Sequence, residues 1–460
     1  LACAAVVLTD PWALWQAGFW LSFVAVGVLF ATDSVAADAY PKGARGHFYA
    51  LLREQWVVTL ALTPLSLLLF GQVSLVGFAA NLLAIPWVTL VVTPLALAGV
   101  VWAPLWSLAA WALQPLAAGL QWLASWPWAV VFLPAAPLWA GVLALLGGGL
   151  LAMRLPWQLR LWSVPLLVPL LCWQAPRPAP GQFELLAPDI GQGNAVLVRT
   201  RTHNLLYDTG PRWTDSADAG SRLIAPYLRG SGAGRIHGLV VSHLDIDHSG
   251  GGRSLLNTLP VDWMLTSVFN EADIVTVARS RGVTPIACIR GQSWQWDGVR
   301  FEVLHPEADS YLEAKLKTND RSCVIKVSSA QFSALLTADI EALSERALVE
   351  RYADQPTMLR SDVLLMPHHG SLTSSTPAFI DAVAPKLALI NAGYRNRFGH
   401  PRDAVLARYR ERDIDVLRTD WHGAIMLDSV SGVAGVRKYR DLRRRYWLDR
   451  PDPADGRPLE

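Results

Sequence analysis

The segment His243–His248 has the composition of a metal-binding site. It reads His-Leu-Asp-Ile-Asp-His, so four of its six side chains end in an imidazole or a carboxylate. The apolar run Gly238–Ser242 precedes it and predicts a buried strand, and the glycine-rich run Ser249–Gly252 follows it. Alternate residues at a strand end point in similar directions, and the last histidine can reach around the turn. Because burying unpaired charge is costly, the pattern predicts metal coordination rather than packing.

Three further predicted strands end in side chains that can bind metals. The first ends in Asp339, the second in the pair His368 and His369, and the third in Asp208. A lone carboxylate at a strand end usually forms a turn, so each of these alone carries little weight. Together with His243–His248, they supply enough nitrogen and oxygen ligands for two metal ions.

Short apolar runs bounded by turns must position these side chains. We expect helices between some of them, at residues 221–228, 340–352 and 376–382. Many short strands with interspersed helices predict a layered α/β domain. The expected strands cover residues 183–187, 195–200, 204–208, 238–242, 300–304, 323–327, 333–337, 363–366, 387–390 and 424–427.

The composition divides the chain near residue 180. The 460 residues include 40 basic and 38 acidic side chains, or 17% charged, against about 25% for an average soluble domain. Residues 1–180 hold ten of these charges but 15 of the 21 tryptophans, and residues 55–153 hold no Asp, Glu, Lys or Arg. A spanning helix needs about 20 apolar residues, so the first part predicts a polytopic membrane domain. A single soluble domain, a disordered chain and a secreted disulfide scaffold are excluded.

We expect this α-helical membrane domain over residues 1–175, and its orientation follows from two basic loops. Lys42, Arg45 and Arg53 lie in one loop and Arg154 and Arg160 in the other, and the positive-inside rule places both loops in the cytoplasm. The last helix then exports the C-terminal domain. If residues 104–124 instead lie flat in the interface, this orientation does not follow. The expected helices lie near residues 12–31, 55–70, 75–102, 104–124, 128–151 and 158–174.

The remaining boundaries come from composition. Leu1 is not a start methionine, so we expect the chain to begin inside a longer membrane domain. A proline-rich linker covers residues 176–182, the α/β domain covers residues 183–430, and a basic tail covers residues 431–460. Arginines interleaved with aromatic rings in this tail favour single-stranded nucleic acid or lipid headgroups equally. The cysteines at 3, 172, 288 and 323 are far apart and form no CxxC pair, so we expect them to be unpaired.

The motifs resemble the ComEC family of DNA-internalisation competence proteins, in which a polytopic competence domain is fused to a metallo-β-lactamase-like domain. The likeness covers about residues 10–430 in the family's order, and the family's amino-terminal portion is absent from this sequence. It implies an αββα sandwich for the second domain. The matching segments are Trp20–Ala25, Asn81–Pro86, Asp189–Asn194, Tyr207–Gly210, Pro226–Arg229, Ser242–Gly251, Leu335–Ile340, Pro367–Ser371 and Asn396–Pro401.

The resemblance implies a metal centre with two halves that share Asp339. The first half would use His243 and Asp245, and the second Asp247, His248 and His369. Asp245 replaces the second histidine of the fold's usual HxHxDH motif. The turn at residues 318–322 lacks the histidine that the wider fold places there, and Asn319 or Asp320 is the expected substitute. Such an oxygen-rich first half suits manganese or magnesium better than zinc, so we expect one or two divalent ions, manganese or zinc, with magnesium as an alternative.

The resemblance also assigns the residues around the metals. His369 aligns with the ligand, so His368 would face the substrate and act in catalysis with Asp247 and His400. Asp208 and Asn194 would support the ligands. Alanine stands at 338 where members of the family carry glycine. The expected substrate contacts are Ser371, Asn396 and Arg397.

The implied function is DNA uptake across the bacterial inner membrane during natural transformation. The chain would form a single-strand channel with a fused nuclease that hydrolyses the non-transported strand, with the lipid bilayer, other competence-machinery proteins and a second copy of this chain as partners. One alternative is a membrane-tethered phosphodiesterase acting on a cell-envelope phosphoester. Another is a DNA-binding channel whose lactamase-like domain is inactive. Antibiotic hydrolysis is disfavoured, because those enzymes are not fused to polytopic helices.

Overall fold

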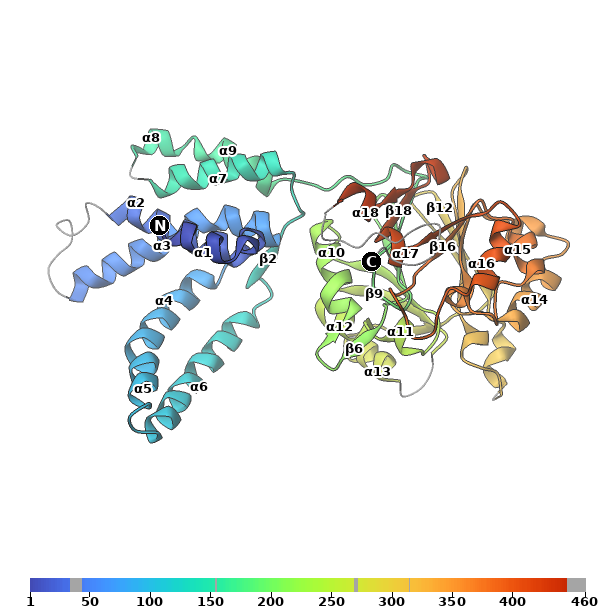
Figure 1. Ribbon diagram of the computed structural model, residues 1–460, viewed down its shortest axis with the longest axis horizontal. Helices are drawn as coiled ribbons and strands as arrows, with labels where there is room; N and C mark the ends of the chain where they lie inside the picture. The colour runs from blue at the N-terminus through green and yellow to red at the C-terminus, as the bar shows by residue number, and fades with distance from the viewer. Residues whose placement is uncertain (34–43, 154, 269–271, 314, 445–460) are drawn as a thin grey trace. The chain divides into compact units, whose positions relative to one another are not determined.

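The computed structural model describes residues 1–33, 44–153, 155–268, 272–313 and 315–444 (Figure 1). The chain divides into two compact units. Unit 1 holds Leu1–Ala175 and the segment Arg229–Gly232, and unit 2 holds Pro176–Leu228 and Ala233–Glu460. The break in sequence after Ala175 lies at the predicted proline-rich linker.

Unit 1 is built from apolar helices. Helix α3 packs against α2 and α7, and α7 packs against α9. Glycines in α7 permit this close packing, since a Cβ at Gly141 would lie 2.4 Å from Leu68 Cδ1. The helices are α1 (Ala2–Thr9), α2 (Ala17–Asp33), α3 (Ala44–Phe70), α4 (Gly77–Trp87), α5 (Thr93–Ala98), α6 (Pro104–Ala124), α7 (Leu138–Ala152), α8 (Trp157–Arg160) and α9 (Ser163–Leu171).

Several predicted helices of unit 1 differ from the structure. The helix expected from residue 128 begins only at Leu138, because β2 (Val130–Phe132) pairs with β1 (Gln72–Ser74) and prolines 134 and 137 follow. The helix expected over residues 75–102 ends at Ala98 and continues from α4 to α5 through a π-helical turn at Val88–Val92. The helix expected over residues 158–174 is divided into α8 and α9. Lys42 and Arg154, both used for the predicted orientation, lie outside the described residues.

Among the described residues, one continuous helical stretch is long and apolar enough to cross a bilayer. It covers Gly77–Ala98, with a mean hydropathy of 1.8, and the apolar helical stretches Ala17–Ala31 and Leu138–Ala152 are shorter. Many large apolar side chains of unit 1 are exposed, among them Trp106, Trp111 and Trp122.

Unit 2 contains two large mixed sheets. The first has the strand order β10-β9-β8-β5-β4-β3-β18-β19 and the second β11-β12-β13-β14-β15-β16-β17. Strands of the first sheet are β3 (Glu184–Ala187), β4 (Val196–Arg199), β5 (Asn204–Tyr207), β8 (Ile236–Val241), β9 (Val261–Thr266), β10 (Pro285–Ala287), β18 (Ile425–Asp428) and β19 (Arg437–Lys438). Strands of the second are β11 (Ser293–Trp296), β12 (Val299–His305), β13 (Val324–Ser328), β14 (Ser333–Leu336), β15 (Val363–Leu365), β16 (Leu387–Ile390) and β17 (Asp415–Arg418).

Helices cover the outer face of each sheet, so unit 2 has four layers (Figure 1). The layers follow from the alternation of side chains along each strand, because successive side chains point to opposite faces of the sheet. In β15, Leu365 packs between the sheets and Leu364 packs under the outer helices. Both strand faces are apolar because both are buried. The helices on the first sheet are α10 (Ala225–Gly230), α12 (Gly252–Thr258) and α13 (Asp273–Ser280). Those on the second are α14 (Ala342–Arg351), α15 (Pro377–Val383) and α16 (Asp403–Arg410).

The sheet of unit 2 continues beyond the predicted domain end at residue 430. β19 pairs antiparallel with β18, and α18 (Tyr439–Leu442) follows it. Arg437 of β19 forms a 3.1 Å ion pair with Glu184 on β3. The first part of the predicted tail therefore belongs to the sandwich, and residues 445–460 lie outside the described residues.

A disulfide joins Cys288 to Cys323, although the sequence predicts unpaired cysteines. Both cysteines are fully buried between the sheets. Cys288 follows β10 of the first sheet and Cys323 precedes β13 of the second. Sandwich formation brings the two cysteines together, and their spacing of 35 residues carries no sequence signal for this. Cys3 and Cys172 are free and exposed.

We expect the double variant Cys288→Ala/Cys323→Ala to be less stable by about 4 kcal/mol, because the disulfide closes a 35-residue loop in the unfolded chain. Thermal unfolding of the full chain in detergent measures the loss. Cys172→Ala, at a free exposed cysteine, is the matched control and should unfold like the wild type. Equal stability of the double variant and the control would show that the bond contributes nothing.

Candidate metal centre

The predicted ligands meet where strands of both sheets end. His243 lies two residues beyond β8, Asp339 three residues beyond β14, and His369 in the turn Pro367–Gly370 after β15. β8 runs parallel to β5, and β14, β15 and β16 run parallel to one another. Their carboxyl ends therefore share one edge of the sandwich, which is where open α/β sheets place their ligand sites.

Asp339 lies at the middle of the cluster. Its Oδ1 is 3.1 Å from His248 Nε2 and 3.6 Å from His369 Nε2. Its Oδ2 is 4.0 Å from His243 Nε2 and 3.6 Å from His368 Nε2. One carboxylate thus faces four imidazoles, His248 and His369 through one oxygen and His243 and His368 through the other.

Two groups of three ligand atoms are compact enough to hold a metal ion. His243, His248 and Asp339 form one, and Asp247, His248 and His369 form the other, with all ligand atoms of each group within 4.8 Å. Asp245 Oδ2 lies 3.7 Å from His243 Nε2.

The donors fit a divalent metal. His243 Nε2 is buried and forms no hydrogen bond with the described residues. His248 Nε2 and His369 Nε2 lie only 3.2 Å apart. Buried nitrogens that converge in this way, beside carboxylates, are what an ion with imidazole and carboxylate ligands requires.

Asp208, fully buried, orients His248. Its Oδ2 lies 2.8 Å from His248 Nδ1, so this nitrogen donates and the other ring nitrogen is left to face the cluster. The same carboxylate accepts from the Asn194 amide at 2.8 Å and from the Ser242 backbone N–H at 2.7 Å. Likewise, His369 Nδ1 lies 2.8 Å from the Asn391 carbonyl oxygen and donates to it.

Gly193 permits a close approach to the ligand segment. Its φ is +140°, and a Cβ there would lie 2.3 Å from the Asp247 carbonyl oxygen. The next residue, Asn194, donates its backbone N–H to that same oxygen at 2.9 Å. The Asp189–Asn194 motif thus holds the ligand segment in place.

Several residues at the centre have left-handed backbones that L-amino acids rarely adopt. Asp208, Ala338, His368 and His369 have φ values of 60°, 47°, 50° and 52°. This conformation costs non-glycine residues of order 1–3 kcal/mol and clusters at functional sites. Glycine adopts a left-handed backbone without strain, which agrees with the glycine that the family resemblance implies at position 338.

The buried ligands form a coupled set of opposite charges. Burial opposes protonation of His248, but the carboxylates of Asp339 and Asp208 face the ring and outweigh burial. They raise the pKa of His248 well above its ordinary value. Burial likewise opposes the charged form of Asp247, yet the hydrogen bond from His369 and the charge of His248 lower the pKa of Asp247 to about 2. Burial also opposes the charged form of Asp339, but the charges of His248 and His369 outweigh it, so the pKa of Asp339 falls well below its ordinary value.

We expect divalent-metal binding to release protons and to strengthen as pH rises. The pKa values of His248 and His369 are raised, which favours the protonated rings in the metal-free centre, and these protons must leave before a metal binds. Affinity for manganese should therefore increase from pH 6 toward pH 8. Titration calorimetry in buffers of different ionisation enthalpy measures the released protons. A pH-independent affinity without proton release would contradict this electrostatic description.

The two candidate substitute ligands lie in different environments. Asp320 is buried and accepts a 3.0 Å hydrogen bond from Ser344 Oγ, which turns it toward α14. Asn319 Oδ1 accepts a 3.3 Å bond from Thr318 Oγ1, which also donates to Asp245 Oδ1 at 3.4 Å. The sequence gives no reason to single out Thr318, because its contact with Asp245 exists only in the folded chain. This geometry favours Asn319 over Asp320 as the substitute.

The remaining predicted residues lie on the turn after β15 and on the loop after β16. His368 is 21% exposed beside Asp339. Ser371 is buried and bonds to Thr373 Oγ1 at 3.1 Å. The side-chain amide of Asn396, predicted to contact substrate, hydrogen-bonds to the backbone of its own loop. Arg397 lies over the ring of Phe398, and His400 Nδ1 is buried without a partner among the described residues.

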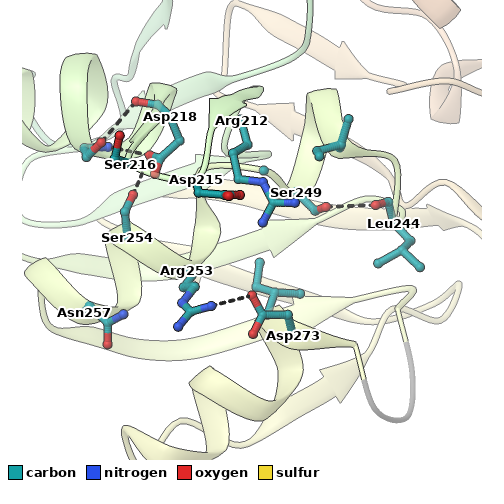
Figure 2. A pocket seen from close by; sticks show the side chains of 14 residues that line it. Arg212, Asp215, Ser216, Asp218, Leu244, Ser249, Arg253, Ser254, Asn257 and Asp273 are labelled. Carbon is teal, nitrogen blue, oxygen red and sulfur yellow. Dashed lines mark hydrogen bonds and ion pairs between the residues drawn. The ribbon is translucent and has the colours of Figure 1, made fainter.

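A hollow of about 610 Å³ lies beside the ligand segment (Figure 2). Leu244 and Ile246, the two apolar residues between the ligands, line one side of it. Arg253 of α12 forms a 3.4 Å ion pair with Asp273 there, and Arg212 of β6 (Arg212–Thr214) forms no ion pair with a described residue. No motif marks these residues in the sequence.

Comparison with known proteins gives matches for both units. Residues 1–158 match the Competence protein family, and residues 188–269 match the Metallo-beta-lactamase superfamily. The second match and the four-layer sandwich agree with the metallo-β-lactamase fold predicted for this part.

Three relatives match along most of this chain. Competence protein ComA of Neisseria gonorrhoeae is 35% identical over 98% of this chain and 61% of its own length. The uncharacterised protein YcaI of Escherichia coli is 33% identical over 91% and 54%, and ComE operon protein 3 of Bacillus subtilis is 27% identical over 92% and 57%. The chain thus spans little more than half the length of these relatives. It belongs to the competence protein family in which a Competence protein region precedes a metallo-β-lactamase superfamily domain.

Proposed function

We propose that this chain takes part in DNA uptake across the bacterial inner membrane. Unit 1 would contribute to a channel for one strand, and unit 2 would hydrolyse phosphodiesters of the strand that is not transported. The observation that carries the proposal is Asp339, whose two oxygens face imidazoles on both sides at the ends of β14, β8 and β15. One relative is named Competence protein ComA, and another ComE operon protein 3.

The proposed ligands are His243, Asp245 and Asp339 for the first half, and Asp247, His248, Asp339 and His369 for the second. A divalent ion held there, manganese or zinc with magnesium as an alternative, would polarise a phosphoryl oxygen and lower the pKa of bound water. The protein supplies the fixed positions of these donors. Asp208 and the Asn391 carbonyl hold two of the rings in the required orientation.

His368 and His400 would face the phosphodiester. Burial and the neighbouring imidazoles of His368 and His369 lower the pKa of His400 to about 4. His400 is therefore neutral near pH 7 and can offer a ring N–H to a phosphate oxygen, but not a positive charge. The role proposed for His400 is to orient the phosphate, with His368 beside it as the group able to move a proton.

Unit 1 would lie in the bilayer with unit 2 on the periplasmic side. Its exposed tryptophans and leucines and the apolar stretch Gly77–Ala98 support the membrane assignment. The disulfide Cys288–Cys323 supports the outer side, because disulfides persist in the oxidising periplasm and are rare in the cytosol. Other competence proteins and a second copy of this chain are further proposed partners.

A competition experiment separates DNA from an envelope phosphoester as the substrate. The full chain in detergent is given manganese and a chromogenic phosphodiester, bis(p-nitrophenyl) phosphate. We expect hydrolysis that a chelator stops and that non-cleavable phosphorothioate DNA inhibits. Hydrolysis without inhibition by DNA would favour the membrane-tethered phosphodiesterase, and absence of hydrolysis with intact DNA binding would favour the inactive channel.

A further inference from the structure

Flat side chains of the loop that follows β16 form a stacked series. The rings of Phe398 and His400 are nearly parallel, at 11°, with centroids 5.9 Å apart. The Arg397 guanidinium lies 4.7 Å from the centroid of Phe398. The ring of His368 lies 5.9 Å from the ring of His400, at an edge-on angle of 62°.

This series begins at the ligand cluster and ends in solvent. His368 Nε2 is 3.6 Å from Asp339 Oδ2. Phe398 is 42% exposed, although a phenyl ring is normally buried. A planar group resting against Phe398 would therefore be separated from the carboxylate Asp339 by only two imidazole rings.

The loop that carries Phe398 is held by its own hydrogen bonds. Asn396 Nδ2 donates to the Gly393 carbonyl at 3.0 Å and to the His400 carbonyl at 2.6 Å, and Asn396 Oδ1 accepts from the His400 N–H at 3.0 Å. The loop backbone that carries the ring is therefore fixed before any ligand arrives, so that binding there costs little ordering.

The loop that carries the ring combines a second aromatic side chain with positive charge. Tyr394 is 42% exposed, and the Arg395 guanidinium lies 5.2 Å from its ring centroid. Neither Arg395 nor Arg397 forms an ion pair with any described residue. Aromatic faces beside unpaired cations match a ligand made of flat bases joined by phosphates.

We propose that Phe398 is a stacking platform for an unpaired nucleobase of a single-stranded nucleic acid. The Arg397 guanidinium, which lies over the ring in this structure, would move off the ring and contact the backbone together with Arg395, and the adjoining phosphate would lie at the ligand cluster. A duplex hides both faces of each base inside its stack, so the platform selects single strands and frayed ends over intact duplexes. This proposal rests on the proposed function for the identity of the cleaved bond.

Binding measured without cleavage tests the platform. Fluorescence anisotropy is recorded for the full chain in detergent with a chelator present, using a labelled short single strand, the corresponding duplex, and an abasic strand that keeps every phosphate. Phe398→Ala removes the ring, Phe398→Trp restores an aromatic face, and Ile286→Ala removes a similarly exposed apolar side chain on the distant edge strand β10.

We expect Phe398→Ala to weaken single-strand binding about tenfold, the loss of one base–aromatic stack, while Phe398→Trp and Ile286→Ala bind like the wild type. Phe398→Ala should not alter binding of the duplex or the abasic strand. Equal losses for all three ligands, or no loss for any, would overturn the platform. A wild-type chain that shows the expected binding but cleaves no DNA with manganese would uphold the platform and overturn the proposed nuclease.

Discussion

Asp339→Ala should abolish metal-dependent DNA cleavage by the full chain. Both oxygens of this carboxylate face imidazoles, Oδ1 toward His248 and His369 and Oδ2 toward His243 and His368, so its loss removes a ligand from both halves at once. We expect a decrease well beyond the roughly 100-fold that loss of a residue orienting a ligand can cost. Cleavage of a labelled strand with manganese, together with metal analysis, measures the effect.

Asp247→Ala and Asp381→Ala make this prediction specific. Asp247 belongs only to the second half, so its loss should abolish cleavage while the first half keeps its donors. Asp381 is an exposed carboxylate on α15, paired with Arg412, and its removal should change neither metal content nor cleavage. Wild-type cleavage by Asp339→Ala, with contamination excluded, would contradict the shared-carboxylate mechanism.

Asp208→Asn should weaken metal binding and also destabilise unit 2. The asparagine would keep the shape but place an amide among the donors of His248, Ser242 and Asn194. Loss of a partner that orients a metal-binding histidine typically costs 10–100-fold in affinity. Breaking a buried charged network costs about 3–5 kcal/mol of stability. Manganese titration and thermal unfolding of the full chain measure the two effects.

Asp218→Asn is the matched control for this substitution. Asp218 also accepts hydrogen bonds from a backbone N–H and a serine hydroxyl in unit 2, from Ser221 at 2.8 Å and Ser254 at 2.6 Å, but it touches no predicted ligand. Its substitution should leave manganese affinity unchanged. If Asp208→Asn binds manganese as tightly as Asp218→Asn does, Asp208 does not orient His248 for metal binding.

The sequence predicted the site best where it contains charged side chains that are costly to bury. His243–His248, Asp339 and His369 were predicted because carboxylates and imidazoles at strand ends have few structural explanations, and the structure brings them together. Ten strands were predicted because strands buried on both faces read as short apolar runs bounded by turns, whereas β9, β10, β11, β17 and β19 of the two sheets were not predicted.

Features that depend on tertiary contacts were not predictable. Cys288 and Cys323 lie on different sheets, so only the finished sandwich shows that they pair. Asp320 and Asn319 are adjacent in sequence, yet the turn sends Asp320 toward Ser344. The parallel rings of Phe398 and His400 depend on the hydrogen bonds of Asn396, which sequence reasoning assigned to substrate.

The source of oxygen in the cleaved phosphodiester distinguishes hydrolysis by unit 2 from DNA binding alone. The full chain, in water enriched in the heavy oxygen isotope and supplied with manganese, is given a DNA strand, and the new terminal phosphates are analysed by mass spectrometry. We expect one oxygen from water in each new terminal phosphate, and no cleavage once a chelator is added. A chain that binds DNA but produces no labelled phosphate under these conditions would show that unit 2 is not a nuclease and leave a DNA-binding channel without hydrolase activity.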